Sequence, residues 1–402
     1  MAFHTLNDLS IGEGDIKTAL VRVDFNVPVI NGTIQDNTRL LRAKRTISEL
    51  QKKGFKVVLI SHFGRPKGRA LSEFSFLPFI ETISETLETP VEFAADCVGP
   101  IAQAAVASLG KGEVLLLENL RFHVGEEAND QDFARALAGL ADVYVNDAFS
   151  ASHRAHASIV GVCAFLPVFA GRALQKELDT LHQALAAPAR PLVALVGGAK
   201  VSSKINLLNN LVAKVDALVI GGGMANSFLA ALGKKVGKSL CEHNLGDTVR
   251  AIMARAKAAN CSLILPVDAA VGYHFEAHAP YQYYAVDAIP TDGMILDVGD
   301  QSIERIKAAI DDAATLIWNG PLGAFELHPF DKATVSCAKR AADRTKEGKL
   351  VSVAGGGDTV SALNHAGVAN DFTYLSTAGG AFLEWMEGKT LPGIAVLERA
   401  EP

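Results

Sequence analysis

Short apolar runs recur along the chain, and each one stops abruptly at polar residues or glycine. Segments with apolar residues at helical spacing, such as 130–141 and 245–260, lie between many of them. Continuous apolar strands that alternate with helices are typical of parallel sheets covered on both faces. The pattern predicts an α/β protein whose strands begin the segments 19–26, 56–65, 114–122, 142–150, 192–200, 217–226, 262–268, 315–323, 349–359 and 372–380.

The residues that end these runs are the candidates for function, because ligands of open parallel sheets bind beyond the carboxyl ends of the strands. In the first half of the chain the run ends are cationic and polar: Arg22, Asp24, Asn26, His62, Arg65, Arg121, His123, Asn146, His153, Arg154 and His156. In the second half they are glycines: Gly197–Gly198, Gly221–Gly223, Gly320, Gly355–Gly357 and Gly379–Gly380. One half suits a small polyanion and the other suits a phosphate chain, which indicates transfer of a group between two ligands.

A helix-patterned segment separates the two halves. The stretch "GRALQKELDTLHQALAAPARP" has a polar face and is stopped by Pro188 and Pro191. A chain of 402 residues is long for a single core. We therefore expect two domains of nearly equal size, 1–172 and 188–387, with a linker helix at 173–187.

Composition narrows the location and the partners. The net charge of −6 argues against a general binder of nucleic acid or anionic membranes. The five cysteines lack CxxC spacing and suit a reducing cytosol. The amino-terminal stretch does not resemble a signal peptide, and no apolar run approaches the length of a membrane span. We expect a cytoplasmic protein that binds small molecules, without a nucleic-acid or membrane partner.

The arginines of the first half predict an anion site. The guanidinium fork matches phosphate and carboxylate oxygens bidentately, so the cluster fits a small ligand that carries both groups. Any single arginine could be surface charge, but together they end successive apolar runs. Asp24 and Asn26 suit a ligand hydroxyl. His153 and His156 are spaced like metal ligands, but no cysteine or carboxylate is near them in sequence, and we expect no metal there.

The glycines at 355–357 predict a phosphate site. They follow a strand and precede Asp358, Thr359 and a helix pattern, so a phosphate could approach the backbone N–H groups at a helix start. Asp358 could also meet Mg²⁺. Alternatively, Asp358 and Thr359 only cap the helix. The glycines at 221–223 are a weaker signal, because they could serve only close packing or a tight turn.

Two further stretches are candidates for nucleotide contacts. In "WNGPLGAFE", Glu326 could hold ribose hydroxyls or be exposed without a role, and Trp318 is expected in the core. The stretch "GGAKVSSK" lacks the spacing of a Walker A loop. It places Lys200 and Lys204 just beyond a strand, in the first turns of a helix. They are either directed at phosphates or part of a solvated helix start.

The motifs resemble those of the phosphoglycerate kinase family, in order and over nearly the whole chain. They are "RVDFNVP" (22–28), "SHFGRP" (61–66), "LLENLRF" (116–122), "NDAFSASHRAHAS" (146–158), "GGAKVSSKI" (197–205), "GGGMANSF" (221–228), "WNGPLGAFE" (318–326), "GGGDTV" (355–360) and "STAGGAFLE" (376–384). The resemblance implies Mg²⁺-dependent, reversible phosphoryl transfer between 1,3-bisphosphoglycerate and ADP, giving 3-phosphoglycerate and ATP, by direct in-line transfer with domain closure. It also implies a monomer of two Rossmann-like three-layer domains joined by a hinge helix, with a tail at 388–402 that packs back on the first domain.

The resemblance assigns roles residue by residue. The phosphoglycerate would be bound by Asp24, Phe25, Asn26, Arg39, His62, Phe63, Gly64, Arg65, Arg121 and Arg154. The nucleotide would be held by Lys200, Lys204, Asn319, Glu326, Gly355, Gly356, Gly357, Asp358 and Thr359, with Asp358 at the metal. The catalytic set would be Arg39, Lys200, Gly379 and Gly380. Arg39 is assigned by resemblance alone. The chain departs from the family at Ala378, where the family has glycine.

Two other functions share parts of the pattern. A nicotinamide-dependent dehydrogenase would also combine strands with glycines, but no G-x-G-x-x-G opens a helix with an acidic residue about 20 positions later. A sugar-phosphate-binding regulator could retain the fold without catalysis. The complete sets of arginines and lysines in both halves argue against that loss of activity.

Overall fold

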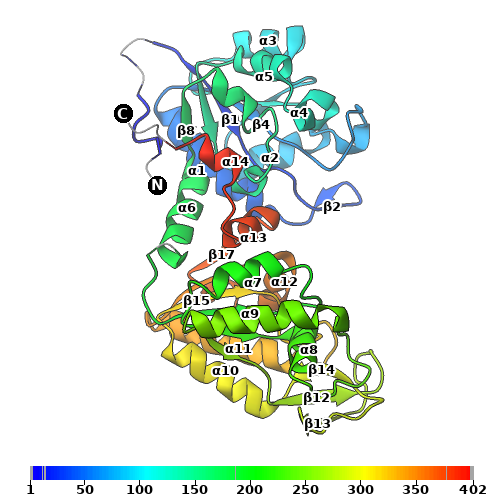
Figure 1. Ribbon diagram of the computed structural model, residues 1–402. Helices are drawn as coiled ribbons and strands as arrows, with labels where there is room; N and C mark the ends of the chain where they lie inside the picture. Colours follow the sequence, from blue (N-terminus) through cyan, green and yellow to red (C-terminus); the bar gives the residue numbers. More distant parts are fainter. Residues whose placement is uncertain (1–2, 11, 13–14, 186, 377, 399–402) are drawn as a thin grey trace. The chain divides into compact units, whose positions relative to one another are not determined.

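The computed structural model describes residues 3–10, 12, 15–185, 187–376 and 378–398. The chain divides into two compact units. Unit 1 comprises Met1–Leu178 and Thr390–Pro402, and unit 2 comprises Asp179–Lys389. In Figure 1, unit 1 is coloured from blue to green with a red carboxy-terminal helix, and unit 2 from green to red.

Unit 1 is built on a six-stranded parallel sheet in the order β5-β6-β4-β1-β7-β8. These strands are β1 (Thr18–Arg22), β4 (Lys56–Ile60), β5 (Val91–Ala94), β6 (Val114–Leu117), β7 (Val143–Asn146) and β8 (Val168–Ala170). The remaining elements are the β2 (Val29–Ile30) and β3 (Thr33–Ile34) pair and helices α1 (Thr38–Lys52), α2 (Ile80–Leu87), α3 (Gly99–Ser108), α4 (Val124–Ala128), α5 (Gln131–Ala138) and α14 (Pro392–Ala395).

Helices cover both faces of this sheet. Val21 of β1 packs in one core cluster with residues of α1 and α2, whereas its neighbour Leu20 packs in a second cluster with residues of α3 and α5. Successive side chains of a strand point to opposite faces, so the two clusters lie on opposite sides of the sheet. The three-layer arrangement predicted from the continuous apolar strands is therefore confirmed for unit 1.

Unit 2 has a second six-stranded parallel sheet, in the order β11-β10-β9-β15-β16-β17. Its strands are β9 (Leu192–Val196), β10 (Ala217–Ile220), β11 (Ser262–Ile264), β15 (Thr315–Asn319), β16 (Val351–Gly355) and β17 (Tyr374–Ser376). Its helices are α7 (Ile205–Leu211), α8 (Gly222–Ala231), α9 (Gly246–Ala258), α10 (Asp300–Asp312), α11 (Lys332–Lys346), α12 (Gly357–His365) and α13 (Gly380–Met386). Trp318, 1% exposed, packs with residues of α10 and α11, which confirms its predicted place in the core.

Each large sheet has a point at which the chain changes direction across it. β1 lies between β4 and β7, and β9 lies between β10 and β15. The strand ends are aligned there, since Arg22 pairs with Ile60 and with Asn146. Connections leave such a point to opposite sides and open a crevice for ligands. In unit 1, Arg22, His62 and Asn146 end or follow these strands, and in unit 2 Gly197, Gly221 and Gly320 directly follow them.

Every predicted run contains a strand, but some strands and boundaries were not predicted. The run at 262–268 contains β11 and ends at Asp268, the first residue of an antiparallel sheet of β12 (Asp268–Gly272), β13 (Tyr281–Ala285) and β14 (Met294–Val298). The edge strands β5 and β8 were also missed. Residues 201–204 form turns, so Lys200 and Lys204 precede α7 instead of lying within its first turns.

The division between the two units falls within α6 (Arg172–Leu185), directly after Leu178. The chain from Thr390 onward groups with unit 1. There Gly393 N–H donates to Ser152 O at 2.8 Å, and Phe3 forms an antiparallel bridge with Glu398. Among the helices described, none combines the length and apolar character needed to cross a membrane.

Candidate active site

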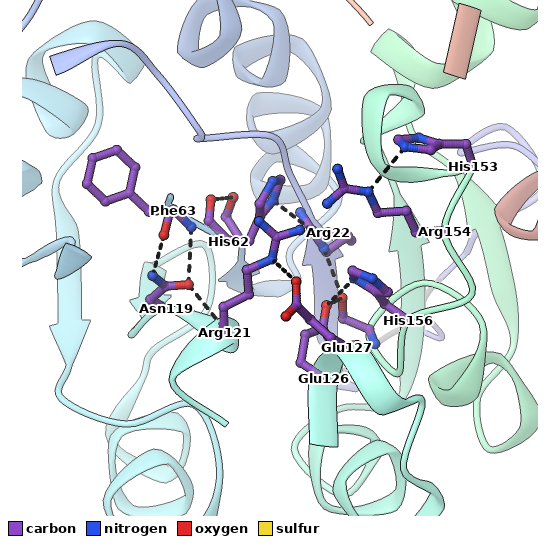
Figure 2. Close-up of polar contacts among 12 residues, drawn as sticks. Arg22, His62, Phe63, Asn119, Arg121, Glu126, Glu127, His153, Arg154 and His156 are labelled. Carbon is purple, nitrogen blue, oxygen red and sulfur yellow. Dashed lines mark hydrogen bonds and ion pairs between the residues drawn. The ribbon is translucent and has the colours of Figure 1, made fainter. Parts of the chain in front are cut away.

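The strand ends of unit 1 bring the predicted arginines and histidines together. Figure 2 shows His62, Arg121 and Arg154 approaching one another from the segments that follow β4, β6 and β7. Of the predicted set, Arg65 is exposed, whereas His62 and Arg121 are buried. His123 is held elsewhere, since its Nε2 lies 2.7 Å from an oxygen of Asp96.

Asp24 holds Arg39 at the start of α1. A guanidinium nitrogen of Arg39 lies 3.0 Å from Asp24 Oδ2 and donates to Asn26 O at 2.8 Å. The hydroxyl of Ser150 also donates to Asp24. Asp24 was predicted to meet a ligand hydroxyl; in the structure it is the partner that orients Arg39. The contacts join Arg39, which was assigned by resemblance alone, to the strand-end cluster.

Asn26 links the segment that follows β1 to the segment that follows β4. Its Oδ1 accepts a hydrogen bond from Gly64 N–H at 2.9 Å. Gly64 has φ +61°, and a Cβ there would lie 2.3 Å from the Phe74 ring. Only glycine fits this turn without displacing the ring. Phe63 is buried against Phe74, Phe76 and Phe79. The predicted residues Phe63 and Gly64 therefore support the site through packing and backbone conformation.

Arg121 is fixed from several sides. It donates to Gly64 O at 2.7 Å and forms an ion pair with Glu127 at 3.1 Å. Asn119 accepts from Arg121 N–H at 3.1 Å and from Phe63 N–H at the same distance. Burial, and then the charge of Arg154, lower the pKa of Arg121. The arginine is therefore oriented before any ligand binds, which reduces the entropy that binding must cost.

The charges of several arginines act on His62 at once. Burial lowers the pKa of His62 well below its ordinary value, and the charges of Arg22, Arg121, Arg154 and Arg39 lower it further. His62 is consequently neutral near pH 7. Cations gathered at strand ends at the cost of mutual repulsion are suited to an anion with several oxygens.

Sequence reasoning missed one buried acid of this region. Glu126 has no exposed surface and accepts hydrogen bonds from Ser158. It stands in the polar stretch "HVGEEAND", where it is indistinguishable from its exposed neighbour Glu127. The one sequence feature related to the burial of Glu126 is its partner Ser158, which ends the separate motif at 146–158.

In unit 2, the glycines of neighbouring strand ends let their loops pack backbone to backbone. Gly320 has φ +100°, and a Cβ there would lie 2.3 Å from Gly197 O. Gly222 has φ +65°, and a Cβ there would lie 2.7 Å from Gly198 N. The glycines at 221–223 therefore serve close packing, the alternative left open above, and Gly222 and Gly223 also line the cavity described below.

The two lysines have different environments. Lys204 Nζ donates to Gly197 O at 2.6 Å and to Asn319 Oδ1 at 2.6 Å, and burial lowers its pKa to about 8. Asn319 in turn donates to Gly355 O at 2.7 Å. These bonds join the ends of β9, β15 and β16. Lys200 is exposed, so its charge can meet a ligand.

The glycine loop before α12 is supported by Thr359. The Thr359 hydroxyl donates to Gly355 O at 2.8 Å and accepts from Gly320 N–H at 2.7 Å. Gly356 occupies the N-cap position with φ +98°. Gly357 and Asp358 are exposed at the helix start. The backbone N–H groups of the first turn can therefore be reached by an anion.

A similar helix start follows β17. Gly379 is the N-cap of α13 with φ +52°, and Gly380 is exposed. In the described part of this loop the positive φ lies at Gly379, while Ala378 is buried and its N–H donates to Ser376 Oγ at 3.3 Å. Both of the predicted glycines are thus at a helix N-terminus.

A cavity of about 500 Å³ opens between the glycine loops and the antiparallel sheet of unit 2. Its walls are mainly apolar, with Leu240, Phe275 and Leu296 among them. Glu326 and Asp358 supply carboxylates. The volume lies within the range of roughly 300–1,000 Å³ of small-molecule sites. An apolar slot with acidic groups, beside a helix start whose N–H groups are accessible, suits a nucleotide.

Two groups of side chains could hold a metal. No hydrogen bond to the exposed Asp358 carboxylate is found within the described chain, so it is open to a cation that also contacts phosphates, as Mg²⁺ commonly does. Asp96, Cys97 and His123 also approach one another. In that group Asp96 Oδ1 already accepts from Cys97 N–H and lies 2.7 Å from His123 Nε2, and we assign no ion to it.

Comparisons with known proteins agree with the motifs. The family model described as phosphoglycerate kinase matches residues 7–389. The phosphoglycerate kinase of Brucella abortus biovar 1 (strain 9-941) is 62% identical over 399 residues, which cover 99% of this chain and 100% of that protein. That of Bartonella henselae is 60% identical over 400 residues and covers 100% of both. The solved structure of phosphoglycerate kinase from Coxiella burnetii is 39% identical, with a TM-score of 0.91, over 98% of this chain and 99% of that one.

Proposed function

The chain belongs to the phosphoglycerate kinase family, and from this premise we propose how its residues divide the reaction. The protein is a kinase whose reaction is reversible phosphoryl transfer between 1,3-bisphosphoglycerate and ADP, giving 3-phosphoglycerate and ATP. Unit 1 binds the phosphoglycerate at its strand ends. Unit 2 binds the nucleotide at its glycine loops and in the adjoining cavity.

The proposal for unit 1 rests on its arginines. A phosphoglycerate has a phosphate and a carboxylate, and Arg121, Arg154 and Arg39, whose charges all act on His62, would neutralise both. Arg65, exposed at the rim, would add a further contact, and Asn26 would hold the segments around the ligand. Neutral His62 would supply a directional hydrogen bond.

The proposal for unit 2 rests on the cavity and the helix starts. Glu326 would contact ribose hydroxyls, and the N–H groups around Gly356 and Gly357 would contact phosphates. Lys204, Asn319 and Thr359 would act through the shape of the loops, since their polar groups bond to backbone there. Asp358 would hold Mg²⁺, which neutralises phosphate charge when bound.

The chemistry needs positioning and charge neutralisation. In the direction of ATP consumption the attacking group is the substrate's own carboxylate, already ionised at neutral pH, so a general base would contribute nothing. Lys200, Arg39 and the N–H groups of Gly379 and Gly380 would stabilise the charge that spreads over the migrating phosphoryl group. Arg39 and Lys200 belong to different units, so transfer would require domain closure.

We also propose that the enzyme acts as a monomer on small molecules, without a nucleic-acid partner. A reducing, cytoplasmic location is in keeping with its cysteines, all five of which are free thiols.

The observation that carries the proposed site is the arginine cluster around His62. A coupled assay of ATP formation from 1,3-bisphosphoglycerate and ADP tests the activity. Replacing Arg121 with Gln should weaken binding of 3-phosphoglycerate and leave binding of ATP unchanged in calorimetric titrations. Equal loss of both affinities would contradict the assignment of the two ligands to different units.

A further inference from the structure

Glu126 and Arg22, two side chains of opposite charge, are buried in unit 1. Glu126, in α4, has no exposed surface, and Arg22, the last residue of β1, is 1% exposed. Burial of either charge alone would be costly, because water could no longer solvate it. The two side chains come from segments far apart in sequence, and Figure 2 shows them within one network.

Ser158 joins the two charges. Its N–H donates to Glu126 Oε2 at 2.9 Å, and its hydroxyl donates to Glu126 Oε1 at 2.6 Å. Because the hydroxyl proton is used on Glu126, the Ser158 oxygen is left as an acceptor, and Arg22 Nε–H donates to it at 3.0 Å. His156 Nδ1 lies 3.7 Å from Glu126 Oε1 on the other side. The hydrogen bonds are therefore all donated in one direction: Arg22 donates to Ser158, and Ser158 donates to Glu126.

The far end of Arg22 determines the state of His62. Arg22 Nη2 lies 3.1 Å from His62 Nδ1. A guanidinium group can only donate, so Nδ1 is the acceptor, and the proton of the neutral ring is then on Nε2. Burial and the surrounding arginines lower the pKa of His62, which keeps the ring neutral.

We propose that Glu126 is a positioning residue that acts through Ser158 and Arg22 to hold His62 as the tautomer protonated on Nε2. The inference rests on the proposed function, in which His62 meets the anionic oxygens of the phosphoglycerate. Such oxygens require a donor. The other neutral tautomer would present a lone pair at Nε2, and a protonated ring would add to the repulsion among the arginines.

The charge of Glu126 matters because it fixes the Ser158 hydroxyl, whose oxygen, together with Val23 O, accepts from Arg22 and orients the guanidinium group. Replacement by Gln retains the shape of the side chain but leaves the buried guanidinium without its balancing charge. Gln also has an amide that donates, which opposes the direction of the donors in the network. Nδ1 of His62 then loses its fixed donor, and both tautomers become populated.

The test is nitrogen-15 NMR of ligand-free enzyme labelled at histidine, with His62→Gln used to assign the ring. The wild type should show the proton on Nε2 of His62 between about pH 6 and 8. Glu126→Gln should show averaged tautomers. In steady-state kinetics the same variant should raise KM for 3-phosphoglycerate about tenfold and leave KM for ATP unchanged, since one oriented donor is lost.

Controls separate positioning from folding. Asp132→Asn, at an exposed acid of α5, should leave both readouts unchanged. Ser158→Ala cuts the link while keeping Glu126, and it serves as the second variant if Glu126→Gln loses its circular dichroism spectrum. A proton on Nδ1 in the wild type, or an unchanged Nε2 proton in the folded variants, would overturn the inference. Absence of kinase activity in the wild type would refute the proposed function instead, and the ligand-free spectrum would still decide the tautomer.

Discussion

Lys200 is the exposed member of the lysine pair that follows β9, and its charge is free to act on a ligand. If Lys200 acts mainly on the migrating phosphoryl group, as proposed, Lys200→Ala should lower kcat on the order of 100-fold. Steady-state kinetics in the direction of ATP formation would measure this. Lys214→Ala, at another exposed lysine of unit 2, is the matched control. If only KM for the nucleotide rose, Lys200 would be a binding residue.

The arginines of the site could be predicted from sequence because each follows an apolar run, and strand ends of parallel sheets share one edge. Arg39 could not, because it begins a helix and looks like a solvated side chain until Asp24 is seen to hold it. Glu126 could not either. Two adjacent glutamates look alike in sequence, and only packing shows that one is buried and the other exposed.

At the scale of elements, Gly357, the first residue of α12, can be compared with Gly379, the N-cap of α13. A Cβ at Gly379 or at Gly357 would meet open space, but only Gly379 has a positive φ, at +52°. Gly379→Ala should therefore destabilise the protein by about 1 kcal/mol. Gly357→Ala should be neutral or slightly stabilising. Thermal melts without ligand would measure both. Equal shifts would mean that backbone strain does not decide the effect.

The start of α6 contains a titratable cap. Asp147 Oδ1 accepts from Ala173 N–H at 2.8 Å and from Leu174 N–H at 3.2 Å. Burial raises the pKa of Asp147 to about 7, although its hydrogen bonds with Thr46 and the helix N–H groups oppose the rise. The folded state thus holds a proton that the unfolded state has already released. Between about pH 4 and 7 this acid should lower stability as pH rises.

Asp147→Asn keeps an oxygen acceptor at the cap and removes the titration. We expect Tm of the variant minus Tm of the wild type to increase from pH 5 to pH 8. The slope set by this one group is limited to about 1.4 kcal/mol per pH unit. Melts across that range would measure it, and a constant or decreasing difference would contradict the raised pKa.

The pattern of apolar runs predicted the central strands because these are buried on both faces. It missed β13, since the tyrosines at 281 and 283 are exposed and the strand has no buried stripe. β5 was missed because its interior contains the exposed Glu92. Edge strands and small antiparallel sheets are stabilised by packing against neighbouring strands more than by their own amino-acid composition. Their positions therefore required the structure.

For the whole molecule, we expect closure to depend on both ligands. Reaction needs donor and acceptor oxygens nearly in line, with water excluded. Either ligand alone should contact groups of mainly one unit and shift the equilibrium only in part. Small-angle scattering should show a clear fall in the radius of gyration only with 3-phosphoglycerate and a non-hydrolysable ATP analogue together. An unchanged radius in the ternary complex would argue against closure.

The grouping of residues from Thr390 onward with unit 1 has a consequence for synthesis on the ribosome. Unit 2 is translated between the two pieces of unit 1, so every residue of unit 2 is made before Gly393 can bond to Ser152. Domains usually fold in the order in which they emerge. Here the first unit to emerge is the last to acquire its full set of contacts. A nascent chain stalled within unit 2 would present the proposed anion site without the bond from Gly393 to Ser152.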